Sequence, residues 1–150
     1  MADLTVTAAN VLAGPNAKFF QNQVLGETVT IGQVVYRSSA DRRWYRAQAT
    51  NQAHILQILA GWGGIAYSGG GAGQLLDVIY EDDDFTPGAT LSLTLGAGET
   101  AGMYVLSATL GGIAPVVDLA ANMYPVHLFS AHSTLKANLK IAVGKGLITA

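Results

Sequence analysis

The amino-acid sequence predicts an all-β protein: a compact antiparallel β-barrel or β-sandwich of jelly-roll type with at most one short helix. Short runs of β-branched and aromatic residues recur at spacings of roughly 8–12 residues, and glycine-rich corners separate them. The chain has 150 residues, enough for one domain to bury its own core. We therefore expect a single β domain over residues 1–150, in which residues 1–17 form an extended N-terminal arm.

The clearest strand pair is a hairpin. Met103–Leu106 is apolar and β-prone, Gly111 and Gly112 make a turn that tolerates positive φ, and Ile113–Val117 returns. Thr90–Leu95 alternates hydroxyl-bearing residues with leucine, which is typical of a half-buried strand.

Further strands are expected wherever a β-prone run lies between turn residues. In chain order they are Leu4–Ala8, Lys18–Val24, Gln33–Arg37, Trp44–Gln48, Gly64–Tyr67, Gln74–Tyr80, Tyr124–Ala131, Leu135–Val143 and Leu147–Thr149. Ser38–Arg43 is the polar loop of one hairpin, and Glu81–Asp84 is expected at an acidic corner. Thr50–Ala60 is the one helical segment, with Thr50 as candidate N-cap and Ala53, Leu56, Ile58 and Ala60 on its apolar side.

Composition limits the classes of function. Only 12% of residues are charged and 50% are apolar, so either small polar residues cover the surface or a partner covers part of it. The net charge of −2 argues against a nucleic-acid partner. The uncharged stretch Ala47–Leu76 is too rich in glycine and side-chain amides for a lipid-facing helix, so we expect no membrane partner. The chain has no cysteine, which excludes disulfides.

Six segments between Leu4 and Ile141 follow one another as LTVTAANV, GETVTIGQVVY, GGIAY, GQLLDVIY, GMYVLSATLGGIAPVVDL and STLKANLKI. This order of strands and turns resembles the head decoration, or cement, proteins of tailed bacteriophages. The resemblance implies a virion protein, made in the bacterial cytoplasm, that binds the outer surface of the capsid and bridges subunits of the major capsid protein. It implies no catalytic residue and no cofactor. The helix-like segment before GGIAY and the acidic cluster Tyr80–Phe85 depart from the family pattern and could mean a different position in the virion.

The only basic cluster is the main candidate for a protein interface. It consists of Arg37, Arg42, Arg43 and Arg46, with Trp44 and Tyr45 between them. On a regular strand Arg42, Trp44 and Arg46 share one face, and Arg43 and Tyr45 share the other. Arginine beside aromatic residues is typical of interface hot spots, although a network within the chain and a nucleic-acid contact are alternatives. Self-association as a dimer or trimer is expected beside the coat contact.

Two further sites are weighed in the same way. Trp62 lies between glycines and is the candidate for an exposed interface anchor, the alternative being packing in the core, which is the default for an aromatic residue. Asp82 and Asp83 are candidates for contact with basic coat residues, the alternatives being a solvated corner and a Ca²⁺ site that lacks EF-hand spacing.

Enzymatic signals are weak. His54, His127 and His132 do not have the spacing of a metal site, and the glycine-rich stretch Ser68–Gly73 precedes a strand rather than the helix that a phosphate loop requires. No serine lies in a G-x-S-x-G elbow. We therefore expect no enzyme, no metal and no cofactor. A receptor-binding or tail-fibre module and, less favoured, a small virion hydrolase stay as alternatives.

Overall fold

The structure is a computed structural model that describes residues 3–93 and 102–144. This part of the chain contains ten strands, one α-helix and two short 3-10 helices. The strands are β1 (Val11–Leu12), β2 (Lys18–Val24), β3 (Val34–Arg37), β4 (Trp44–Arg46), β5 (Gly63–Ala66), β6 (Leu75–Pro87), β7 (Met103–Leu106), β8 (Ile113–Pro115), β9 (Val126–Ala131) and β10 (Ala137–Val143). The helices are α1 (Gln52–Leu59), η1 (Ala8–Asn10) and η2 (Val116–Asp118).

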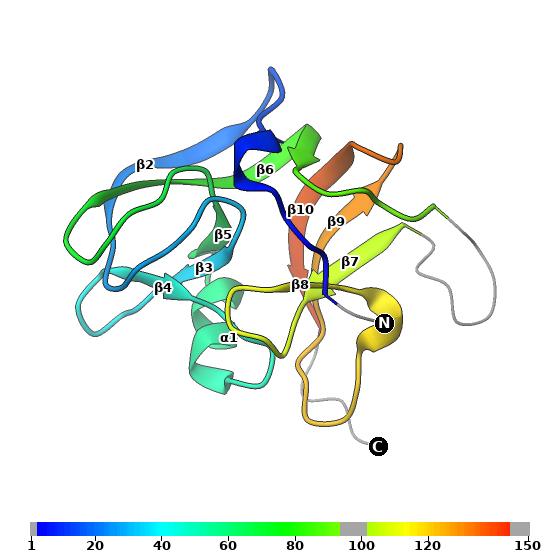
Figure 1. Ribbon diagram of the computed structural model, residues 1–150. Helices are drawn as coiled ribbons and strands as arrows, with labels where there is room; N and C mark the ends of the chain where they lie inside the picture. The colour runs from blue at the N-terminus through cyan, green and yellow to red at the C-terminus, as the bar shows by residue number, and fades with distance from the viewer. Residues whose placement is uncertain (1–2, 94–101, 145–150) are drawn as a thin grey trace.

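The long strand β6 joins two groups of strands into one curled antiparallel sheet. The first half of β6 pairs with β5 and β2, and its second half pairs with β10 and β1. The order along the sheet is β4–β3–β5–β6–β10–β9–β7–β8. The sheet curls into a half-barrel, with α1 beside β3 and β5 (Figure 1). The prediction of an all-β fold with one short helix is confirmed.

Alternation along the strands gives the sheet two hydrophobic cores. In β3, Val34 belongs to the larger core and its neighbour Val35 to the smaller one, because successive side chains point to opposite faces. The smaller core contains Leu25, Val29, Val35, Trp44, Ala66, Leu76 and Val78. An isolated bridge joins Leu25 to Trp44, so the end of β2 reaches β4 and this part of the sheet wraps around the smaller core.

The predicted strand Leu4–Ala8 is wrong. Residues 3–7 run as an extended segment without strand pairing, and η1 follows. Residues 3–17 also do not project as an arm: Leu4 and Val6 pack against the larger core, Val11 is buried, and β1 pairs with β6. In the predicted strand Thr90–Leu95, the described residues 90–93 form no strand, and the rest lies outside the described residues, as does the predicted strand Leu147–Thr149.

The acidic corner predicted at Glu81–Asp84 is also wrong, because β6 runs straight through these residues. Lys140 of β10 pairs with Glu81 from one side, and Lys18 of β2 pairs with it from the other. Neighbouring strands therefore bring lysines to the acidic run, which offsets its like-charge repulsion and allows the strand to continue.

The predicted helix is present but shorter than expected. Asn51, rather than Thr50, is its N-cap, since the Asn51 side chain accepts a hydrogen bond from the backbone N–H of Ala53 at 3.0 Å. Ile55 and Ile58 are its buried residues, whereas Leu56, which was expected on the apolar side, is exposed.

Candidate functional site: an arginine–aromatic surface

The β3–β4 hairpin positions the predicted interface residues. Register pairs Arg37 with Trp44, and Val35 with Arg46, so these four side chains share one face of the sheet. The expectation that Trp44 and Arg46 share a face therefore holds. Arg42 is not on the strand: it lies in the loop with a left-handed backbone, φ 60°.

Trp44 is a core residue, so its assignment to an interface is wrong. Its side chain is completely buried, and its indole Nε1 donates a hydrogen bond to Oε1 of Gln23 at 3.1 Å. Phe20 of β2 contacts it with ring centroids 5.6 Å apart. Trp44 is the first residue of β4 and points to the inner face of that strand, which places the largest side chain of the hairpin in the smaller core.

Arg37 and Trp62 come together at the margin of this core. The guanidinium carbon of Arg37 lies 3.4 Å from the centre of the Trp62 ring, and the Arg37 backbone N–H donates to the Trp62 carbonyl at 3.0 Å. Phe20 packs against the Trp62 ring at 5.3 Å and stacks on Tyr80 at 4.5 Å. Trp62 is therefore half-buried rather than an exposed anchor, and Arg37 covers one face of its ring.

Sequence reasoning missed Phe20 and Tyr80. Both lie on strands with strong apolar signals, but the pairing of β2 with β6 that brings them together is not visible in the sequence. We call Arg37, Trp62, Phe20 and Tyr80 the aromatic cluster.

Arg46 is held within the chain, which is the intramolecular network weighed as an alternative. Glu27 accepts hydrogen bonds from the Arg46 backbone N–H at 2.7 Å and from its guanidinium at 3.4 Å. Both side chains are about one-third exposed or less. Arg46 is thus engaged in positioning the segment after β2 against β4.

Arg42 and Arg43 are exposed in the hairpin loop, which is internally braced. Ser38 and Arg43 are joined through a backbone hydrogen bond of 2.9 Å. The Asp41 carboxylate accepts hydrogen bonds from the Tyr45 hydroxyl and from the Arg43 backbone N–H. The bond from Tyr45 is the main cause that lowers the pKa of Asp41, and the same bond raises the pKa of Tyr45. The loop therefore holds Arg42 and Arg43 outward on an ordered frame.

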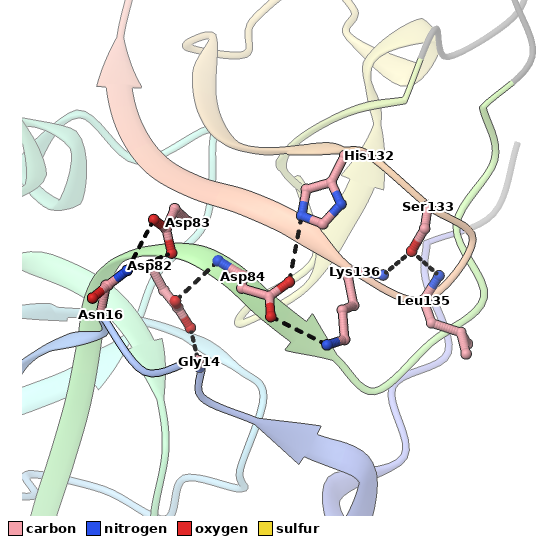
Figure 2. A network of polar contacts seen from close by, with 9 residues as sticks. All are labelled: Gly14, Asn16, Asp82, Asp83, Asp84, His132, Ser133, Leu135 and Lys136. Atoms are coloured by element: carbon pink, nitrogen blue, oxygen red, sulfur yellow. Dashed lines mark hydrogen bonds and ion pairs between the residues drawn. The ribbon is translucent and has the colours of Figure 1, made fainter.

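The acidic run forms a polar network that fastens two loops to β6 (Figure 2). Asp82 is 1% exposed and accepts hydrogen bonds from the backbone N–H groups of Gly14 at 2.7 Å and Asp84 at 3.0 Å. Its assignment to an interface is wrong, because both carboxylate oxygens are used inside the protein. A Cβ at Gly14 would lie 2.7 Å from the Asp82 carboxylate, so only glycine permits this approach.

The other acidic residues of the network have partners of different kinds. Asp83 is exposed and accepts a hydrogen bond from the Asn16 amide at 3.2 Å. Asp84 pairs with Lys136 at 3.1 Å and lies 3.7 Å from the His132 ring. Glu81 pairs with Lys18 at 2.8 Å, and Lys18 is the main cause that lowers the pKa of Glu81. Within residues 3–93 and 102–144, no group of three or more His, Cys, Asp and Glu side chains could hold a metal ion.

The structure also places a serine beside a histidine, which the sequence could not show. The Nε2 atom of His127 lies 2.9 Å from the Ser130 hydroxyl, and its Nδ1 atom faces the backbone carbonyl of Lys140 at 3.2 Å. A serine nucleophile and its histidine base would make the contact between the Ser130 hydroxyl and His127 Nε2. In a catalytic triad a carboxylate accepts the hydrogen bond from the other ring nitrogen, whereas Nδ1 of His127 faces a backbone carbonyl. We therefore assign no reaction to the pair.

Comparisons with known proteins find no relative that could indicate what this surface binds. No protein-family model matches the chain, and no curated protein or solved structure shows a significant match. Among the described residues, α1 is the longest helix, and neither it nor the 3-10 helices have the length of apolar sequence needed to span a bilayer. The assignment of function therefore depends on the residues themselves.

Proposed function

We propose that this protein is a structural component of a phage virion that binds the outer surface of the capsid and reinforces it by bridging coat subunits. The observation that carries the proposal is the braced arginine loop beside the aromatic cluster, on a chain whose sequence resembles capsid decoration proteins. The contact surface of this proposal consists of Arg42 and Arg43 at its centre, with Arg37 and Trp62 at its margin.

The loop is suited to binding because its backbone is already ordered. Association loses free energy when side chains and loops must be fixed at the interface, and a preformed loop reduces that loss. The hydrogen bonds of Asp41 and Ser38 hold the backbone of the Arg42–Arg43 turn before any partner arrives. The partner surface is therefore expected to be acidic and to accept hydrogen bonds from guanidinium groups.

Repeated copies make a modest contact sufficient. A shell presents the same acidic surface many times, and linked copies bind with an avidity that exceeds the affinity of one site. Self-association as a dimer or trimer belongs to this proposal. A low charge fraction favours such contacts, because few charges must be desolvated when copies meet.

The test is a binding experiment with undecorated phage heads. Purified protein is incubated with the heads, and bound copies are counted by electron microscopy. We expect ordered density at symmetry-related positions for the natural protein, and we expect Arg43→Glu to weaken binding at least tenfold while its circular dichroism spectrum stays unchanged.

Gln52→Glu is the control, because it adds a negative charge at an exposed position in the first turn of α1, where a carboxylate suits the helix N-terminus. It should bind like the natural protein. An absence of ordered density on the shell would refute decoration, and equal losses for both variants would show that net charge rather than the loop governs binding.

A further inference from the structure

The N-terminal strap, residues 3–7, lies in a slot between the edge strand β8 and the segment that follows β6. The Leu4 backbone N–H donates to the Ile113 carbonyl in β8 at 2.8 Å, and the Thr7 N–H donates to the Gly88 carbonyl just after β6, also at 2.8 Å. In Figure 1 this dark-blue segment crosses from β8 towards the end of β6. The Asp3 carboxylate accepts a hydrogen bond from the buried Ser107 hydroxyl at 2.8 Å.

The slot is shaped to the strap by three glycines. A Cβ at each of them would meet a strap atom at 2.6–2.7 Å: Val6 Cγ1 at Gly32, the Thr7 carbonyl at Gly88 and the Asp3 carboxylate at Gly112. Larger residues would push the strap out, so the backbone around the slot forms a specific binding surface for this extended segment.

The strap is nevertheless attached lightly. Leu4 and Val6 are only partly buried, and a cavity of about 340 Å³ lies beside them. On the other side, Thr5 and Thr7 line a cavity of about 450 Å³. Both cavities open to solvent, and Thr5 and Thr7 are exposed, so the outer side of the strap is not covered as a core strand would be.

A natural hinge follows the strap. Residues Ala8–Asn10 form the 3-10 turn η1, which has no buried residue, and firm attachment begins at Val11, which is 6% exposed and pairs with β6. Movement at η1 would release the strap without disturbing β1.

We propose that the slot accepts the strap of a second copy, so that neighbouring molecules exchange their N-terminal segments. This inference rests on the self-association included in the proposed function and names its contact. The occupant is defined by the structure, because the slot already binds this segment within the chain. The exchanged and closed forms make the same contacts, so they differ in free energy mainly through the entropy of association and the conformation of the hinge.

Concentration decides which form prevails. A segment on a short linker has an effective concentration of about 1 mM at its own slot, so dilute protein is expected as a closed monomer. Copies held side by side, or protein concentrated to about 1 mM, reach the range in which exchange competes.

The experiment uses the full chain without a shell, so its failure would leave shell binding open. The natural chain has no cysteine, and Thr5 and Thr90 are exposed residues that line the same cavity. Variants Thr5→Cys and Thr90→Cys, with tags of different length, are mixed at about 1 mM, unfolded, refolded together and treated with a short bismaleimide crosslinker. We expect a crosslinked pair that contains one chain of each variant, and much less of it with Ser39→Cys in place of Thr90→Cys.

A second variant separates exchange from simple contact. In Thr5→Cys/Thr90→Cys, crosslinking in dilute solution fixes the strap in its own slot. This locked protein should stay monomeric in analytical ultracentrifugation at about 1 mM, whereas the natural protein refolded at that concentration should form dimers or larger species. The proposal is overturned if the natural protein stays monomeric, or if the locked protein associates equally well.

Discussion

Replacement of Asp82 by asparagine tests whether the acidic run stabilises the fold. Asp82 is 1% exposed, and its two oxygens accept hydrogen bonds from the backbone N–H groups of Gly14 and Asp84. Asparagine keeps one acceptor oxygen but turns an NH₂ group towards the other donor. A hydrogen bond to a charged group contributes about 1.5–3 kcal/mol, and a buried donor left without a partner adds to the loss. We expect the free energy of unfolding to fall by about 2–4 kcal/mol.

Urea unfolding followed by tryptophan fluorescence measures this change, with a lower midpoint at an unchanged m-value. The melting temperature should fall by roughly 4–16 °C for a chain of this length. Asp83→Asn is the control, since Asp83 is exposed and its change should stay within about 0.5 kcal/mol. Equal stabilities of the two variants would refute the assignment of Asp82 as a structural residue.

Three further changes test other parts of the structure. Burial lowers the pKa of His54, so the unfolded chain binds a proton more readily than the folded chain does. The free energy of unfolding should therefore fall as the pH drops below about 6.5. His54→Asn should reduce that pH dependence, which urea titrations at about pH 7.5 and about pH 5.5 would measure. Trp44→Ala should destabilise the fold by about 3–5 kcal/mol and Trp62→Ala by about 1–2 kcal/mol, and equal losses in urea unfolding would contradict the burial difference. Gly14→Ala should cost about 1–3 kcal/mol in thermal unfolding, because its Cβ would press on the Asp82 carboxylate, and a neutral result would show that the loop moves aside.

Local sequence patterns predicted much of the sheet, because the alternation of apolar and polar residues that indicates a strand lies within the strand itself. Lys18–Val24 was predicted with the bounds that the structure has, and Met103–Leu106 likewise. The acidic run escaped prediction because its strand depends on partners far along the chain. Lys18 and Lys140 approach it from β2 and β10, and no pattern within residues 81–84 reveals them.

The same limit applies to the candidate site. The arginine-rich loop was visible from its composition, and Arg42 and Arg43 are exposed as an interface requires. Trp44 was misjudged because a hairpin strand has two faces, and the sequence does not show that a second core lies beneath one of them. The meeting of Phe20 with Trp62 likewise depends on how β2 closes against β6.

Charged side chains are distributed unevenly over the molecule. Most acidic side chains of β6 have partners within the chain, namely Lys18 for Glu81, backbone N–H groups for Asp82 and Lys136 for Asp84. Internal pairing reduces the field that these groups present to a distant partner. Arg42 and Arg43 instead stand exposed at one end of the sheet, on a loop whose backbone is already fixed. An acidic surface would therefore meet this end first, and the strap, which lies between β8 and the segment after β6, would be left available to a neighbouring copy.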